Sequence, residues 1–259
     1  MNDIFTPDQI ADLSGISQIC EELGADLVVI GATSLLIFMG DLGRFTRDVD
    51  LTVALDFDEF ERLTTRLAAI GWTPAPKLEH RWIAPRQTII DLLPAGTELR
   101  RSGSITWPAS QFKMSLAGFE HVFAYAVEVN LPGGAAIRVA PPIVTALLKI
   151  IAWVDDQYRR AKDLQDIRIV LRCYEQESDR LFSDAVFDAG LPDFEFANAF
   201  LLGVDMRALA TGDEARFVEQ FLGRLLVQDE DGRFDDESDF GMKSFRGQIE
   251  AFKKGFSRR

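Results

Sequence analysis

The stretch Asp48-Val49-Asp50-Leu51-Thr52-Val53-Ala54-Leu55 decides the fold and the chemistry that the fold can support. Its apolar residues predict a buried strand over Val49–Leu55. Alternate side chains of a strand share a face, so Asp48 and Asp50 are expected to point the same way, about 6.6 Å apart. Two carboxylates so placed repel each other unless cations lie between them, and Mg²⁺ takes carboxylate and phosphate oxygens. The stretch therefore predicts a metal site at the start of a strand.

A second segment, Gly31-Ala32-Thr33-Ser34, lies thirteen residues before Asp48. We expect a buried strand over Leu27–Ile30 and a short helix over Ala32–Met39. A glycine at such a junction lets the backbone approach a phosphate, and the N–H groups of the helix start favour an anion. Thr33 and Ser34 add hydroxyl donors, so the segment predicts a phosphate-binding turn.

A third carboxylate interrupts the apolar run Ile89-Ile90-Asp91-Leu92-Leu93. An acid in an apolar strand is costly unless it is paired or bound to metal. Taken alone, Asp91 fits a cap or a surface residue at a strand end, and Asp48 with Asp50 fits a turn or a solvated strand edge. Taken together with Gly31, the three acids favour one metal site.

The first half of the chain, from Asp26 to Val139, alternates short apolar runs with amphipathic stretches. This texture is typical of a mixed α/β domain. The remaining elements that we expect in it are a helix over Asp58–Ile70, a hairpin of Arg81–Ala84 with Thr88–Leu93, and strands over Val122–Val129 and Ile137–Val139.

The second half changes character after Pro141 and Pro142. Ile143–Val154 is apolar at helical length, and the chain up to Leu226 lacks strand-like alternation. The predicted fold is therefore an α/β (α+β) domain with a mixed sheet, followed by a mostly helical C-terminal domain. We expect the first domain over residues 1–140, a helical domain closing the active-site cleft over 141–228, and an acidic connector with a basic amphipathic tail over 229–259.

The tail from Lys243 to Arg259 interleaves basic residues with Phe245, Phe252 and Phe256. Such a pattern predicts an amphipathic terminal helix that packs its phenylalanines. A grip on RNA or on a partner surface is the alternative.

Composition narrows the classes of function. The 259 residues carry a formal charge of −13, from 28 basic against 41 acidic residues, which argues against broad adhesion to nucleic acid. Met1–Leu13 lacks a signal-peptide pattern and no apolar run approaches the ~20 residues that span a bilayer, so we expect a cytoplasmic protein without a membrane partner. Cys20 and Cys173 match no metal spacing and are expected to be reduced, buried thiols.

Other enzyme classes fit the sequence less well. His80 and His121 have no partner at metal spacing and are interpreted as structural or surface residues. Hydrolase elbows, P-loops and dinucleotide glycine motifs are missing from the sequence. Asp48-Val49-Asp50 also fits haloacid-dehalogenase-like phosphatases, but their apolar strand precedes the aspartates, whereas here it follows them.

Two sets of residues resemble a known family. One set resembles the minimal nucleotidyltransferase fold, whose superfamily includes DNA polymerase beta: Gly31-Ala32-Thr33, Arg44, Thr46, Asp48-Val49-Asp50 and Asp91. The other resembles the "K…R…KDxxD" helical pattern of the AbiEii branch: Lys149, Arg159 or Arg160, Lys162-Asp163 and Asp166. Members of that branch include toxins of type IV toxin-antitoxin systems, some of which transfer nucleotides to the 3′ end of tRNA. The resemblance covers about residues 25 to 172, and many members have Gly-Gly or Gly-Ser where this chain has Gly31-Ala32.

The resemblance implies two-metal phosphoryl transfer from a nucleoside triphosphate, with Mg²⁺ or Mn²⁺ as cofactor. Asp48 and Asp50 would bind both metals and the triphosphate, and Asp91 would ligate the metal that activates the acceptor hydroxyl. The nucleotide would contact Gly31, Ala32, Thr33, Ser34, Arg44, Thr46 and Lys149.

In the second half, Lys149 would contact triphosphate oxygens. Asp163 would orient Lys149 or assist deprotonation of the acceptor, and Asp166 would pack the helices through a salt bridge, although the two acids could exchange roles. A lysine that snorkels to solvent and ordinary surface charges are the simpler interpretations of these residues.

The acceptor is left open by the sequence. A tRNA is one expectation and an antibiotic or other small molecule is another. A toxin would have a separately encoded antitoxin as its partner. The non-enzymatic alternative is a catalytically degenerate binding module of a toxin-antitoxin pair, against which the three retained carboxylates count.

Overall fold

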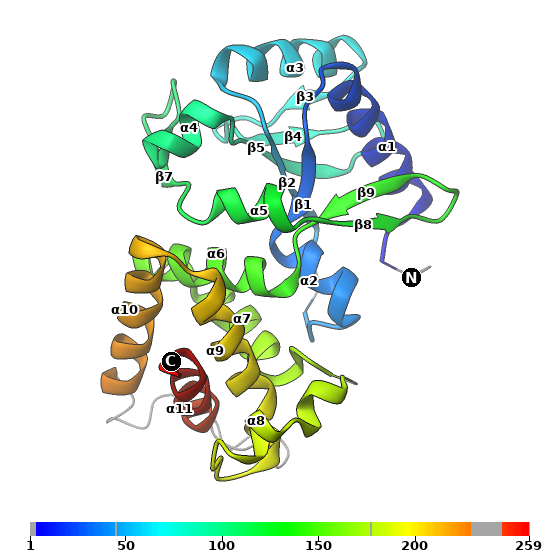
Figure 1. Cartoon of the computed structure of the whole chain (residues 1–259). Coiled ribbons are helices and arrows are strands. Elements are labelled where there is room, and N and C mark those ends of the chain that lie inside the picture. The colour runs from blue at the N-terminus through cyan, green and yellow to red at the C-terminus, as the bar shows by residue number, and fades with distance from the viewer. Residues whose placement is uncertain (1–3, 45, 177, 229–244, 259) are drawn as a thin grey trace. The chain divides into compact units, whose positions relative to one another are not determined.

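The computed structural model describes residues 4–44, 46–176, 178–228 and 245–258 (Figure 1). The chain divides into two compact units, Met1–Thr145 and Ala146–Arg259. The division falls within helix α6 (Pro142–Asp155), a few residues after the boundary near Ala140 that the sequence predicts.

The first unit is built on a seven-stranded mixed sheet with the order β3-β4-β5-β2-β1-β9-β8. β2 lies inside the sheet, antiparallel to β1 and parallel to β5. β1 also pairs in parallel with β9, while β3, β4 and β5 form antiparallel pairs. The strand bounds are β1 Leu27–Ile30, β2 Asp48–Val53, β3 Thr73–Pro74, β4 Arg81–Ile83, β5 Ile89–Pro94, β8 Val127–Asn130 and β9 Ala136–Val139. The predicted strands before residue 100 and the Arg81–Leu93 hairpin are confirmed.

Helices and a small second sheet complete this unit. The helices are α1 Pro7–Glu22, α2 Gly31–Met39, α3 Phe57–Ala69, α4 Thr97–Ser102 and α5 Phe119–Tyr125, and β6 Ser104–Thr106 pairs with β7 Lys113–Ser115. α1 begins with a capping box in which Thr6 and Gln9 bond to each other's backbone N–H groups. α2 and α3 confirm the predicted helices, whereas α1 and α4 were not expected.

The predicted strand over Val122–Val129 is wrong in its first half. α5 occupies Phe119–Tyr125, and β8 begins only at Val127. Phe119 and Val122 are both buried and lie one helical turn apart, so the apolar run faces the core as a helix. A short apolar run fits a strand and a helix equally well by pattern alone.

The second unit is helical, as predicted. It contains most of α6 and the elements α7 Ala161–Cys173, η1 Asp179–Phe182, α8 Asp184–Phe187, η2 Phe194–Phe196, α9 Ala197–Leu209, α10 Gly212–Gln228 and α11 Phe245–Phe256. Its largest fully buried side chains are Phe200, Phe221 and Phe252. The mixed-sheet first half and the helical second half confirm the predicted fold class.

The basic tail forms α11, which buries Phe245, Phe252 and Phe256. This confirms the amphipathic packed helix. α11 lies so close to α9 that a Cβ atom on Gly203 would come within 3.0 Å of the Phe252 carbonyl oxygen. The expected acidic connector, Asp229 to Asp239, lies outside the described residues. Among the helices that are described, none is both long and apolar enough to cross a membrane.

Candidate active site

The three predicted carboxylates lie on one face of the sheet. β2 and β5 run in parallel with Asp50 directly opposite Asp91, and Asp48 precedes Asp50 by two residues. Side chains at paired positions, and at alternate positions of one strand, share a face. All three acids are half-buried, so solvent reaches them. The structure thus brings together the acids that the sequence singled out.

Gly31 is required by the approach of Asp50. Ile30 pairs with Asp50 across β1 and β2, and Gly31 then turns into α2 with a φ of 66°. That left-handed conformation favours glycine. A Cβ atom at Gly31 would also overlap the Asp50 carboxylate. The sequence predicted that Gly31 lets a phosphate approach the backbone. In the structure, Gly31 lets the Asp50 carboxylate approach the start of α2.

Arg81 on β4 is the main residue of this site that sequence reasoning missed. Its Nε lies 2.7 Å from Asp91 Oδ1, and its Nη2 lies 2.8 Å from Asp91 Oδ2 and 2.7 Å from Asp48 Oδ2. The hydrogen bonds to Asp91 are the largest cause of an upward shift in the pKa of Arg81, which stays a cation. Arg81 and Asp91 are direct partners in the antiparallel β4–β5 pair, a juxtaposition that only the sheet register reveals.

His80 lies beside the same acid. Its Nε2 is 4.0 Å from Asp91 Oδ2, and its ring centroid is 5.7 Å from that of Trp107. The sequence offered no metal spacing for His80, and the structure makes it a neighbour of the carboxylates through its position next to Arg81.

Hydroxyl groups support the backbone around Asp48. Thr33 Oγ1 donates to the Asp48 carbonyl oxygen at 3.2 Å. Thr46 Oγ1 lies 3.3 Å from the same carbonyl oxygen and 3.4 Å from Asp48 Oδ1. Arg44 lies half-buried in the segment between α2 and β2. Thr33 and Thr46 therefore contact the first aspartate, Asp48.

The start of α2 is buried. Ala32, Thr33 and Ser34 are each at most 5% exposed. Ser34 Oγ donates to the Gly31 carbonyl oxygen at 2.9 Å and lies 2.7 Å from Thr145 Oγ1. The Ser34 hydroxyl is thus engaged within the first unit.

In the second unit, Lys149 on α6 forms a buried cluster with two acids of α7. Its Nζ lies 2.7 Å from Asp163 Oδ1 and 2.8 Å from Asp166 Oδ2. Burial lowers the pKa of Lys149, but the two carboxylates outweigh it and the net shift of the pKa is upward. Both acids hold the ammonium group, so Lys149 does not snorkel to solvent.

Comparison with protein families gives a match over most of the chain. The model described as "Nucleotidyl transferase AbiEii toxin, Type IV TA system" matches residues 17–254. The chain belongs to the AbiEii family. The resemblance predicted from Gly31, the three carboxylates and the Lys149 segment is confirmed.

Solved structures offer only distant likenesses to this AbiEii chain. An antigenic nucleotidyltransferase-like protein from Paracoccidioides brasiliensis is 18% identical, with 71% of this chain and 89% of that chain covered and a TM-score of 0.43. The antibiotic-resistance factor ANT(2'')-Ia, in complex with adenylyl-2''-tobramycin, is 14% identical, with 62% and 86% covered and a TM-score of 0.41. No curated protein matches. The family assignment rests on the family model.

Nucleotidyltransferases generally use a nucleoside triphosphate and a divalent metal. The donors of this site suit such an ion, because Asp48, Asp50 and Asp91 offer oxygen ligands, and two of them, Asp48 and Asp91, already bind one cation, Arg81. Within the part of the chain that the structure describes, no three His, Cys, Asp or Glu side chains converge into a ready metal site. The carboxylate ligands therefore suit a divalent metal, and Arg81 binds two of the three carboxylates, Asp48 and Asp91.

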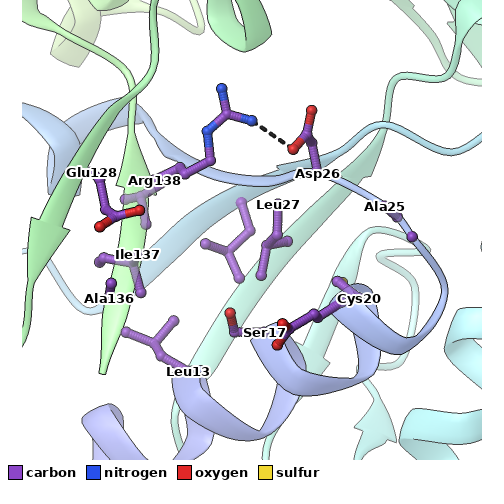
Figure 2. Close-up of a pocket in the computed structure, with 14 residues that line it drawn as sticks. Leu13, Ser17, Cys20, Ala25, Asp26, Leu27, Glu128, Ala136, Ile137 and Arg138 are labelled. Atoms are coloured by element: carbon purple, nitrogen blue, oxygen red, sulfur yellow. Dashed lines mark ion pairs between the residues drawn. The ribbon is translucent and has the colours of Figure 1, made fainter. Parts of the chain in front are cut away.

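A separate cavity of about 410 Å³ lies in the first unit, between α1 and the strands β1, β8 and β9 (Figure 2). An ion pair of 2.6 Å between Arg138 and Asp26 lies at its rim. Leu51 lines this cavity and follows Asp50 on β2, so the cavity and the carboxylates lie on opposite faces of the sheet. Cys20 also lines it, and burial raises the pKa of this thiol to about 12.

Proposed function

We propose that this AbiEii chain transfers a nucleoside monophosphate from a nucleoside triphosphate to a hydroxyl acceptor, with Mg²⁺ or Mn²⁺ bound by Asp48, Asp50 and Asp91. The observation that carries the proposal is the pairing of Asp50 with Asp91 across β2 and β5, with Asp48 on the same face. Three half-buried acids placed side by side repel one another, and the arrangement is stable only with cations between them.

We assign a separate role in the reaction to the metal ions and to each carboxylate. Divalent ions held by the carboxylates would polarise the acceptor hydroxyl and neutralise charge on the leaving pyrophosphate. Asp48 and Asp50 would hold the triphosphate side, next to the start of α2 at Gly31. Asp91 would ligate the metal that activates the acceptor hydroxyl for in-line attack on the α-phosphorus, with pyrophosphate as the leaving group.

Lys149 would bind triphosphate oxygens in this scheme. Its contacts with Asp163 and Asp166 support a fixed, charged ammonium group. Both acids are positioned to orient the lysine, and a proton-accepting role for Asp163 is the alternative that the family resemblance offers.

For the acceptor we propose the 3′ end of a tRNA, on the strength of the family resemblance. The family is described as a toxin of a type IV system, so we also propose a separately encoded antitoxin as partner. Two free cysteines are consistent with a cytoplasmic location, where thiols stay reduced.

The first test is calorimetry of the full chain with ATP, GTP, CTP and UTP, each with and without Mg²⁺, on the wild type and on Asp50→Asn. Asp58→Asn is the matched control, because Asp58 is an exposed acid on α3. We expect metal-dependent binding of at least one triphosphate in the wild type and the control, and its loss in Asp50→Asn.

Transfer is then assayed with the labelled nucleotide that binds. Bulk tRNA and a hydroxylated aminoglycoside serve as alternative acceptors, so label on the aminoglycoside alone would redirect the proposal to small molecules. Equal activity of Asp48→Ala, Asp50→Ala and the wild type would refute the mechanism. A folded wild type that binds none of the four triphosphates would favour the degenerate binding module.

A further inference from the structure

Arg81 bridges two of the acids to which the proposed function gives a metal ion. Both oxygens of Asp91 and one oxygen of Asp48 lie within 2.8 Å of its guanidinium nitrogens. The fork engages Asp91 in the bidentate geometry that makes arginine–carboxylate pairs strong. Arg81 thus already neutralises part of the charge that a metal ion would neutralise.

The metal ion and this contact would compete for the same carboxylates. A divalent ion bound between Asp48 and Asp91 would sit within a few ångströms of the guanidinium, where like charges repel strongly at the dielectric of a protein surface. Both oxygens of Asp91 already accept hydrogen bonds from Arg81, so a metal ion between the two acids would compete for their remaining lone pairs and favour the withdrawal of Arg81.

If the Arg81 side chain withdraws from the carboxylates, its guanidinium still remains near the site. β4 pairs with β5 so that Arg81 faces Asp91 through the backbone, and the side chain is 30% exposed. A guanidinium released towards solvent would stay within one side-chain length of the carboxylates. A planar fork of donors suits phosphate oxygens as well as carboxylates.

We propose that Arg81 is an exchangeable internal cation of the active site, which holds Asp48 and Asp91 until metal and triphosphate enter and then transfers its hydrogen bonds to the triphosphate. Arg81 is a substrate-binding residue in this scheme. It weakens the binding of metal alone and strengthens the binding of metal with triphosphate, so the two ligands bind cooperatively. The inference rests on the proposed function, because the triphosphate is its second ligand.

Arg81→Gln tests the exchange, because it removes the charge while keeping a polar side chain. Affinity for Mn²⁺ alone is measured from the free-ion electron paramagnetic resonance signal. Affinity for the Mn²⁺ complex of inorganic tripolyphosphate is measured by calorimetry in excess Mn²⁺, which avoids the question of base preference. We expect Arg81→Gln to bind Mn²⁺ about tenfold more tightly and the tripolyphosphate complex about tenfold more weakly than the wild type.

Two further variants complete the design. Arg101→Gln is the matched control, because Arg101 pairs with Glu98 at 2.8 Å on the exposed face of α4 and should change neither affinity. Arg81→Lys keeps the charge but loses the fork, so its Mn²⁺ affinity should lie between those of the wild type and Arg81→Gln. Arg81→Lys also decides the matter if Arg81→Gln does not fold without metal.

A purely structural role for Arg81 would lower both affinities, so opposite changes are the signature of exchange. Mn²⁺ affinities of both Arg81 variants within twofold of the wild type would overturn the inference. Asp50→Asn separates this failure from failure of the proposed site. If Asp50→Asn binds Mn²⁺ as the wild type does, the carboxylate site is wrong; if it loses Mn²⁺ while Arg81→Gln is unchanged, only the exchange is wrong.

Discussion

Replacing Gly31 with alanine should disturb the site through Asp50 rather than through the backbone alone. Gly31 has a φ of 66°, which disfavours any residue with a side chain. The added methyl group would also overlap the carboxylate of Asp50 and touch its Cβ atom at 3.0 Å. Rotation of the Asp50 side chain about its first bond would move the carboxylate but not the Cβ atom, so β2 or α2 must shift.

The two costs can be separated by a matched variant. The left-handed conformation costs about 1–2 kcal/mol for an alanine. Overpacking against a neighbour costs about 1–3 kcal/mol more. Gly24 has a φ of 65° with no atom within 4 Å of an added Cβ, so Gly24→Ala carries only the first cost. We therefore expect Gly31→Ala to lower the free energy of unfolding by about 2–5 kcal/mol and Gly24→Ala by about 1–2 kcal/mol.

Urea unfolding gives the stability of both variants, and calorimetry with Mg²⁺ and the preferred triphosphate gives binding. Gly31→Ala should weaken metal-dependent nucleotide binding at least tenfold, because the displaced Asp50 carboxylate can no longer ligate the metal in the required geometry. Gly24→Ala should bind as the wild type does. Equal stability losses in the two variants, together with unchanged binding in Gly31→Ala, would refute the idea that the approach of Asp50 fixes this glycine.

Two other predictions concern the helical unit. Lys149→Met leaves Asp163 and Asp166 buried without their cation, which should cost about 3–5 kcal/mol in urea unfolding at pH 7. The exposed control Lys253→Met should cost almost nothing. Gly203→Ala should destabilise by about 1–3 kcal/mol, because its Cβ meets backbone atoms of α11. Gly223→Ala, in open space on α10, should instead stabilise by up to about 1 kcal/mol, and a shared sign of the two changes would contradict the close packing of α9 on α11.

The sequence predicted those elements whose pattern is local. β1, β2 and the β4–β5 hairpin followed from apolar runs bounded by turn residues. α1 was missed because its buried face includes an acid. Asp12 is 2% exposed and accepts a hydrogen bond from Thr88 Oγ1 at 2.7 Å, a partner 76 residues away. No local pattern can anticipate a buried acid whose partner lies in a distant turn between two strands.

The sequence predicted some residues of the site and missed others. Asp91 stood out because a single acid in an apolar strand needs a partner. Arg81 did not stand out, because an arginine at the start of a hairpin strand is unremarkable until the sheet order is known. Its role depends on β4 lying beside β5, and on a register that pairs it with Asp91.

That register explains why the site is a row across strands rather than a motif along one. Arg81, Asp91, Asp50 and Ile30 are successive partners on β4, β5, β2 and β1, and Gly31 follows Ile30. A slip of one residue between β4 and β5 would turn Arg81 to the opposite face and bring Trp82 among the carboxylates. Trp82 is 8% exposed and pairs with the fully buried Ile90, so such a slip would expose a large apolar side chain to solvent. The burial of Trp82 on the apolar face of the hairpin therefore holds Arg81 opposite Asp91 on the polar face. In that position the positive charge of Arg81 neutralises the carboxylates.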